Sequence, residues 1–168
     1  MKEAIVTRRL TLKSFIDRDK DVFITIVKDP LVKKTYMLPD FASIEEEEAF
    51  FQRLKKATLD DTRFVYGIYL NNEIIGFINE VSKEEDSIEI GYFISSKHWN
   101  QGFASEALWA AIKELFKMGY QHVYAGFFEG NIASERVMQK CGMSKIDKVD
   151  KITYRNQEHL CYYYKIDK

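Results

Sequence analysis

Cysteine and histidine, from which disulfide frameworks and structural zinc sites are built, are scarce in this sequence. The two cysteines, Cys141 and Cys161, have no C-x-x-C spacing, and the three histidines have no H-x-x-x-H spacing. A domain held together by disulfides or zinc needs several such residues at regular intervals. We therefore expect no disulfide and no metal site, and we expect both cysteines to be reduced, buried thiols.

Long apolar segments and an excess of one charge are also missing. The longest apolar runs, such as Val22 to Val27, are far too short to span a bilayer, and residues 1–15 lack the apolar core of a signal peptide. With 25 Lys and Arg against 26 Asp and Glu, the formal net charge is −1. No overall basic field favours nucleic acid or an anionic membrane. We expect a cytoplasmic protein that binds neither directly.

The sequence does contain an ordinary globular composition and a regular succession of apolar patterns. Its 168 residues, 46% of them hydrophobic, fit a single domain over residues 1–168, because no repeat, low-complexity tract or linker interrupts them. Alternating and 3.6-residue periodicities predict the order β-α-α-β-β-β-α-β-α-β-β. Strands are expected at 4–12, 63–70, 73–81, 87–94, 122–127 and twice within 143–166, and helices at 17–29, 43–58, 103–116 and 131–142.

This order predicts a mixed α/β (α+β) fold with a central sheet of six to seven strands and helices on both faces. The strands at 87–94 and 122–127 should be parallel, because the helix between them makes a βαβ unit. Local signals support the expected boundaries. They are the N-caps Asp17, Ser43 and Asn131, the hairpin turn Asn71-Asn72, and the helix-ending glycines Gly119 and Gly142.

The segment from Trp99 to Ala104 (WNQGFA) lies where the strand at 87–94 ends and the helix at 103–116 begins. At such a junction the first N–H groups of the helix point at one place, and Gly102 lets an anion approach the backbone. This pattern predicts a pyrophosphate-binding turn. The alternative is an ordinary strand-to-helix turn, in which glycine is common. A P-loop is disfavoured, because the G-K-[ST] ending is absent.

With a second motif downstream, this turn resembles that of the GNAT superfamily of acetyl-CoA-dependent N-acetyltransferases. The second motif, NIAS at 131–134 followed by KCGM at 140–143, is similar to the family's N-x-x-S and K-x-G-F. The segment TRRLTL at 7–12 and the initial Trp99 are similar to the branch that acetylates the N-termini of ribosomal proteins. The chain differs from the family pattern in two ways. Met143 stands in place of Phe, and the turn has no Lys or Arg. Lys97 and His98, just before the turn, are the nearest candidates to supply a positive charge.

The resemblance implies acetyl-CoA as co-substrate, without a metal. It places the thioester carbonyl near the backbone of Phe93 and Ile94, the cofactor arm near Asn131 and the thiol end near Ser134. The residues implied in cofactor binding are Phe93, Ile94, Trp99, Asn100, Gln101, Gly102, Phe103, Ala104, Asn131 and Ser134. The alternatives are that Phe93 and Ile94 are plain sheet residues and that Asn131 is only a helix cap.

Direct acetyl transfer needs an unprotonated amine, so a base is sought near the thioester. Glu89, on the strand that leads to the turn, is the leading candidate for this base. The alternative interpretation is that Glu89 is an ordinary surface carboxylate or forms a structural salt bridge. Glu129 is the second candidate. Many relatives carry a tyrosine as general acid one or two helical turns after the Asn, but this chain has Val137 and Met138 there. Tyr124 and Tyr164 are available instead, and Cys141 as a covalent nucleophile is disfavoured at a helix C-terminus.

The resemblance therefore predicts an N-acetyltransferase that acts on a protein N-terminus, a small amine or a polyamine. The alternative is a degenerate module that binds acyl-CoA without turnover. The acidic run Glu45–Glu48 has two interpretations, either attraction of a cationic acceptor or an ordinary solvated helix face. A homodimer is compatible with the sequence.

Overall fold

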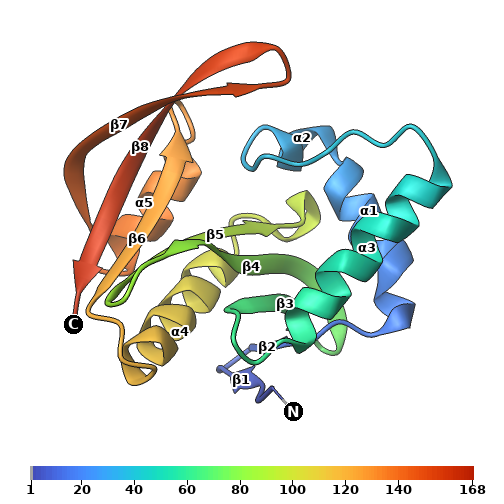
Figure 1. The fold of residues 1–168 in the computed structure, drawn as a ribbon, viewed down its shortest axis with the longest axis horizontal. Helices are drawn as coiled ribbons and strands as arrows, with labels where there is room; N and C mark the ends of the chain where they lie inside the picture. Colours follow the sequence, from blue (N-terminus) through green and yellow to red (C-terminus); the bar gives the residue numbers. More distant parts are fainter. Residues whose placement is uncertain (1) are drawn as a thin grey trace.

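The computed structural model describes residues 2–168, in which eight strands form one sheet in the order β1-β2-β3-β4-β5-β6-β8-β7 (Figure 1). The strands are β1 (Ile5–Val6), β2 (Leu10–Lys13), β3 (Val65–Leu70), β4 (Glu73–Lys83), β5 (Ser87–Ile94), β6 (His122–Phe128), β7 (Ser144–Tyr154) and β8 (Gln157–Asp167). The helices are η1 (Asp17–Asp19), α1 (Lys20–Lys28), α2 (Pro30–Lys33), α3 (Ile44–Leu59), η2 (Ser96–His98), α4 (Phe103–Lys117) and α5 (Ile132–Lys140). Within residues 2–168, none of these helices combines the length and apolarity needed to cross a membrane.

Helices cover both faces of this sheet, as the sequence predicts (Figure 1). One face packs against α4 and α5 through a core that includes Ile88, Ile90, Leu108 and Met138. The opposite face packs against α1 and α3 through an aromatic cluster, formed by Phe15, Phe23, Phe51, Phe77 and Phe93. Alternation along β5 sends Ile88, Ile90, Tyr92 and Ile94 to the first face and Glu89, Gly91 and Phe93 to the second.

The strand predicted at 4–12 is wrong in one respect, because it is broken into β1 and β2, which pair antiparallel. The break is the turn at Thr7–Arg9, where Thr7 N–H donates to the Leu10 carbonyl at 2.9 Å. Glu106 of α4 fixes this turn by accepting from Thr7 Oγ1 at 2.6 Å and Arg9 N–H at 2.8 Å. A tertiary contact therefore overrides the local strand pattern, and the sheet has eight strands instead of six to seven.

Most local signals act as predicted. Ser43 caps α3 by accepting from Glu46 N–H at 3.2 Å, and Asn71 and Asn72 both have the positive φ of a tight hairpin turn. The predicted Asp17 cap is wrong, since no side-chain cap bond forms there and Asp17 pairs with Lys55 at 2.5 Å. The reason is that a turn of 3-10 helix, η1, precedes α1.

The sheet opens between β5 and β6, the two strands that pair in parallel as predicted. Their pairing covers only Ser87–Glu89 of β5 and His122–Tyr124 of β6. Beyond that point β5 continues beside β4 as far as Ile94, and β6 continues beside β8 as far as Phe128. The two strands therefore diverge above Glu89, as Figure 1 shows, and leave a gap between their backbones.

Candidate active site

A cleft of about 710 Å³ lies where β5 ends, between the start of α4 and the start of α5. It is lined by the last residues of β5, by the turn after it, and by the segment from Gly130 to Lys140. Every predicted cofactor-binding residue except Gln101 lines this cleft. The structure therefore brings together the two motifs that the sequence separates, and their part in binding stays a prediction.

The turn presents the N-terminus of α4 to the cleft. Gly102 is the N-cap and has a φ of +80°, a conformation that glycine adopts without strain. The first helical N–H groups, which have no acceptor within a helix, belong here to Phe103, Ala104 and Ser105, and all three residues line the cleft. Such a terminus attracts an anion through its N–H groups and its dipole.

Trp99 and Gln101 have different parts in this turn. The indole Nε1 of Trp99 donates to the carbonyl of Ile94 at 2.8 Å, which fixes the turn to the end of β5. Gln101 is exposed and outside the cleft, and its carbonyl accepts from Arg9 Nη1 at 2.8 Å. Arg9 comes from the β1–β2 turn, so the sequence motif could not indicate it.

The side of the cleft formed by the start of α5 carries polar and positively charged side chains. Asn131 accepts from Ser134 N–H at 3.2 Å, so the side chain caps α5, and its Nδ2 donates to Ser134 Oγ at 3.0 Å. Tyr92, which sequence reasoning missed, donates from β5 to the Ser134 carbonyl at 3.4 Å. Arg136 and Lys140 also line the cleft and supply the positive charge that the turn lacks.

Glu89 lies on the opposite face of the sheet, at the last residue of β5 that pairs with β6. It is half-buried, and burial raises its pKa above the usual value of 4.5, an effect that Lys148 opposes and Asp150 reinforces. A partly desolvated carboxylate with a raised pKa, at the base of the gap, suits a general base. Its role as the base stays a prediction.

Tyrosines and a second carboxylate surround Glu89 on this face. Tyr36 lies against Gly91, where an added Cβ would be 2.8 Å from its ring, and it donates to Asn79 Oδ1 at 2.6 Å. Burial raises the pKa of Tyr36 to about 12, and the charge of Glu89 adds to the rise. Tyr163 donates to Asp150 Oδ2 at 2.8 Å. We name these groups the Glu89 face: Tyr36, Glu89, Asp150 and Tyr163.

The tip of the β7–β8 hairpin contacts the segment between α2 and α3. Tyr154 Oη donates to the Leu38 carbonyl and accepts from the Leu38 N–H, both at 3.2 Å. Arg155 pairs with Asp40 at 3.6 Å. We name this contact the strap. It joins segments that are 116 residues apart in the chain.

Of the other candidates from the sequence, only Tyr124 lies next to Glu89. Glu129 is exposed and accepts from Tyr162 Oη at 3.3 Å. Tyr164 donates to Glu135 Oε1 at 2.9 Å on the α5 side. Tyr124 pairs with Glu89 across β5 and β6. Cys141 is a buried free thiol, and burial raises its pKa to about 11, which disfavours it as a nucleophile.

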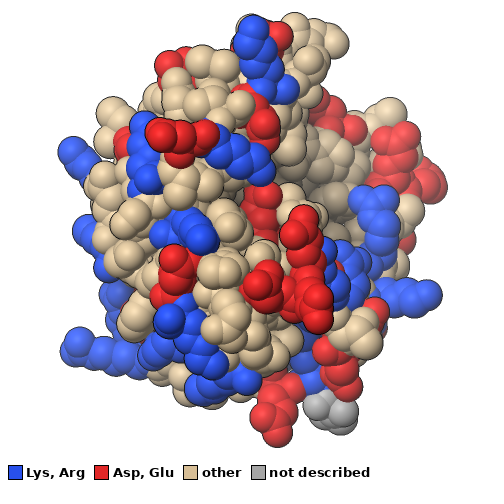
Figure 2. Space-filling view, turned by 60° about the vertical axis from the view of Figure 1, so that its left-hand side comes forward, with Lys and Arg blue, Asp and Glu red and all other residues tan. Residues whose placement is uncertain are grey.

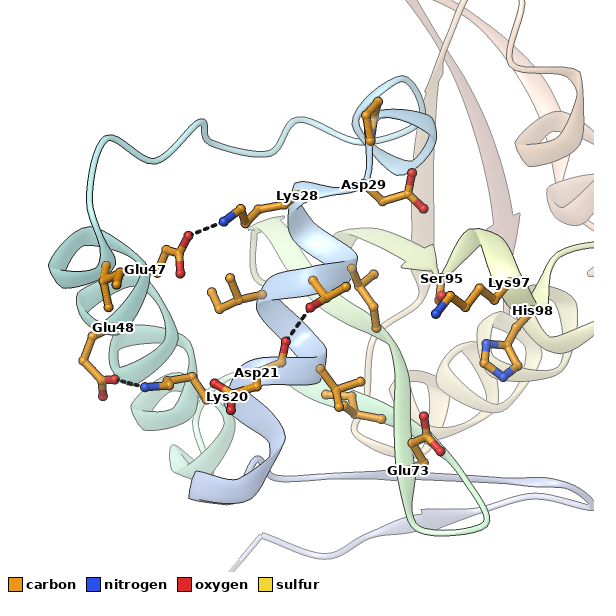
Figure 3. Close-up of a pocket in the computed structure, with 17 residues that line it drawn as sticks. Lys20, Asp21, Lys28, Asp29, Glu47, Glu48, Glu73, Ser95, Lys97 and His98 are labelled. Carbon is orange, nitrogen blue, oxygen red and sulfur yellow. Dashed lines mark hydrogen bonds and ion pairs between the residues drawn. The ribbon is translucent and has the colours of Figure 1, made fainter.

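A second cavity, of about 890 Å³, lies between α1, α3 and η2 (Figure 3). Four of its charged side chains form ion pairs, Lys20 with Glu48 and Lys28 with Glu47, each at 2.6 Å. Two members of the acidic run are thus held in ion pairs with α1, which favours the structural interpretation of that run.

Charges of both signs are interspersed on the face drawn in Figure 2, in line with the formal net charge of −1. Among residues 2–168 there is no group of three or more His, Cys, Asp or Glu side chains arranged to hold a metal ion.

Comparison with known proteins decides the family. The model of the GNAT acetyltransferase domain matches residues 9–144, which include Arg9, the cleft and Glu89. The chain belongs to the GNAT acetyltransferase family. As a GNAT protein it is an acetyl-CoA-dependent N-acetyltransferase.

Individual GNAT relatives agree with this assignment. YoaA of Bacillus subtilis, named an uncharacterised N-acetyltransferase, is 28% identical over 155 residues, which cover 89% of this chain and 88% of YoaA. The crystal structure of a GNAT acetyltransferase from Bacillus anthracis is 27% identical, with a TM-score of 0.82 over 98% of each chain. RimL, a ribosomal L7/L12 α-N-protein acetyltransferase solved with coenzyme A, has a TM-score of 0.80 over 98% of each chain. At 19% identity, it shows the shared fold.

Proposed function

We propose that this GNAT protein moves the acetyl group of acetyl-CoA directly to a primary amine, through the gap between β5 and β6. The observation that carries the proposal is that divergence. Beyond Glu89 the two strands no longer pair, and the cleft lies on one face of the sheet and Glu89 on the other. A thioester that enters from the cleft thus meets an amine held on the Glu89 face.

On the cofactor side, the N-terminus of α4 would hold the pyrophosphate, with Arg136 and Lys140 adding positive charge. Asn131 and Ser134 would contact the pantetheine arm near its thiol end. A backbone N–H at Phe93 or Ile94 would donate to the thioester oxygen as negative charge develops there. One well-aimed donor of this kind contributes roughly 3–4 kcal/mol to the transition state.

On the acceptor side, Glu89 would take a proton from the attacking amine. The C–N bond forms, the C–S bond breaks, and the thiolate leaves and gains a proton. On this proposal the hydroxyls of Tyr92 and Ser134, two residues that line the cleft, would stabilise the departing sulfur. The thiolate is only weakly basic, since the reference pKa of a thiol is about 8.5. Protonation of the leaving thiolate therefore needs less catalysis than deprotonation of the amine.

The acceptor class follows from the charges of the Glu89 face. Asp150 and Glu89 are carboxylates, and tyrosine hydroxyls surround them. This environment suits a cationic primary amine. An α-amine, with a reference pKa about 7.7–8.0, is partly neutral at neutral pH and needs less help than a lysine amine at about 10.4. We therefore propose a protein or peptide N-terminus as the preferred acceptor, ahead of a small amine or a polyamine.

The first test is release of the CoA thiol from acetyl-CoA in the presence of N-terminal peptides, small amines and polyamines. Release that depends on the acceptor supports the proposal, with peptides expected to give the highest kcat/KM. Binding of acetyl-CoA without acceptor-dependent release across the panel would contradict the assignment of amine acetylation.

The second test compares Glu89→Gln with Glu129→Gln. We expect Glu89→Gln to lower kcat by about 100-fold or more, the usual contribution of a general base, and Glu129→Gln to change it little. The base must be ionised, so the parent rate should fall as pH decreases through a Glu89 pKa raised above 4.5. This fall in rate at low pH should disappear in Glu89→Gln, so that only the titration of the acceptor amine shapes the pH profile.

Loss of activity in Glu89→Gln should not come from unfolding. Because burial raises the folded-state pKa of Glu89, the parent loses stability as pH rises through that pKa. Glu89→Gln removes this cost at neutral pH, so its Tm should equal or exceed that of the parent. An unchanged rate in Glu89→Gln together with a slow Glu129→Gln would move the role of base to Glu129.

A further inference from the structure

Arg9, in the turn between β1 and β2, holds the pyrophosphate turn from outside the cleft. Its Nη1 donates to the Gln101 carbonyl at 2.8 Å, and its guanidinium carbon lies 4.4 Å from the centroid of the Phe103 ring. Its Nη2 is 3.3 Å from the point that a Cβ on Gly102 would occupy. One guanidinium therefore contacts Gln101 and Phe103 and lies beside Gly102 between them.

Arg9 is itself fixed by Glu106, in the first turn of α4. Arg9 Nε donates to Glu106 Oε2 at 2.7 Å, and Arg9 N–H donates to Glu106 Oε1 at 2.8 Å. Thr7 Oγ1 donates to the same Oε1 at 2.6 Å. The hydrogen bonds keep the pKa of Glu106 below its usual value although burial opposes this, so the carboxylate stays charged beside the guanidinium.

We propose that Arg9 is a positioning residue for the diphosphate of acetyl-CoA, an inference that rests on the proposed function of this turn. It holds the Gln101 carbonyl on the outer side of the turn, so that N–H groups and no carbonyl oxygen face the phosphates. Its guanidinium lies beside a turn that has no Lys or Arg of its own, and Glu106 balances its charge.

The conformation of the turn explains why such a support is needed. Asn100 has a φ of +59° and Gly102 has a φ of +80°, so two of its residues occupy the left-handed region. Asn100 is not a glycine, and this conformation costs it roughly 1–2 kcal/mol. A turn of this kind keeps its N–H groups aligned only where surrounding contacts hold it. Arg9 and Trp99 supply those contacts from opposite ends.

The competing explanation is that Arg9 merely anchors the N-terminal hairpin to α4. The two explanations differ in their dependence on the diphosphate. S-acetylpantetheine carries the same thioester as acetyl-CoA and lacks the diphosphate and the nucleotide. A positioning residue for the diphosphate affects acetyl-CoA alone, whereas a structural anchor affects both donors equally.

The experiment measures KM and kcat for both donors in the parent, Arg9→Ala, Arg9→Lys and Arg8→Ala. Arg8 is the matched control, because it is exposed, adjacent and equally charged. We expect Arg9→Ala to raise KM for acetyl-CoA by about tenfold, the effect of one lost hydrogen bond to a charged group, with S-acetylpantetheine kinetics unchanged. Arg9→Lys keeps the positive charge but loses the planar guanidinium, which donates to Gln101 and Glu106 at the same time. Its KM should therefore lie between those of Arg9→Ala and the parent.

Calorimetric binding of CoA and of pantetheine gives a readout that needs no turnover. Arg9→Ala should lose CoA affinity by the same factor, keep its weak affinity for pantetheine, and retain the Tm of the parent within a few degrees, since exposed ion pairs contribute little. Unchanged CoA affinity in Arg9→Ala, or an equal loss for both ligands, would overturn the inference alone. A parent that fails to bind CoA would overturn the proposed function, and this inference with it.

Discussion

Asn131 contacts Ser134 through both ends of its amide group, one bond capping α5 and the other reaching the hydroxyl. The capping role and a cofactor role can be separated, because Asp caps a helix as well as Asn does. We expect Asn131→Asp to keep the Tm of the parent and to raise KM for acetyl-CoA, since the amide donor is lost. Asn131→Ala should raise KM and also lose about 1 kcal/mol of stability.

Thermal unfolding and donor kinetics measured on the same two variants decide between the roles. If Asn131→Asp matches the parent in both measurements, the side chain is only a cap, and the family-derived contact with the cofactor arm is wrong for this chain.

The sequence could predict which single residues line the cleft where those residues belong to a motif. The turn and the NIAS motif indicated the residues that line the cleft, and Glu89 was indicated by its place on the strand before the turn. Arg9 lies in the TRRLTL segment, but that resemblance did not indicate its contact with the turn, and Tyr92 belongs to no motif. Arg9 reaches the turn from 92 residues earlier in the chain, and Tyr92 has the ordinary periodicity of a strand residue.

Helix α4 begins and ends with a glycine of positive φ, +80° at Gly102 and +106° at Gly119. An alanine at either position is strained by roughly 1–2 kcal/mol, so Gly102→Ala and Gly119→Ala should lose similar stability. Only Gly102→Ala should raise KM for acetyl-CoA, because relief of the strain would turn the N–H groups of the turn away from the cleft. Gly119 has no atom within 4 Å of an added Cβ.

Chemical denaturation and donor kinetics of this pair test whether the conformation of the turn, and not general stability, governs binding. Equal KM values in the two variants would contradict the assignment of the turn as the anion site.

Elements with local signals were predictable, and elements set by tertiary contacts were not. The Ser43 cap, the Asn71-Asn72 hairpin and the helix-ending glycines follow from the preferences of those residues for particular backbone conformations. The break between β1 and β2 follows from Glu106, which is about 100 residues away, so the pattern at 4–12 predicted one strand. Asp17 resembled a cap, but η1 displaced the start of α1 to Lys20.

Over the whole molecule, the sheet separates the face that holds the cleft from the Glu89 face, which we propose as the cofactor side and the acceptor side, and β5 and β6 diverge beyond Glu89. Periodicity predicted that these strands are parallel, because a helix connects them. It could not predict that pairing stops at Glu89, since the length of a ladder depends on how β4 and β8 hold their neighbours. The acceptor side, built from the Glu89 face and the strap, likewise carries no sequence motif.

The strap joins the two halves of the chain over the acceptor side and can be tested without touching the cleft. Tyr154→Phe removes the hydroxyl that both donates to and accepts from Leu38. Each such bond contributes about 0.5–1.5 kcal/mol. We therefore expect KM for the amine to rise severalfold while KM for acetyl-CoA stays constant, because only the acceptor side loses order.

Hydrogen exchange at the amide of Leu38 reports the same change directly, since this N–H is bonded to Tyr154 Oη at 3.2 Å and should exchange faster in Tyr154→Phe. Tyr162→Phe is the matched control, because it removes a hydroxyl from the same hairpin that bonds Glu129 instead of the strap. Faster exchange with an unchanged amine KM would mean that the strap stabilises the hairpin without shaping the acceptor site. A rise in both KM values would mean that the strap transmits order through the sheet to the cofactor side as well.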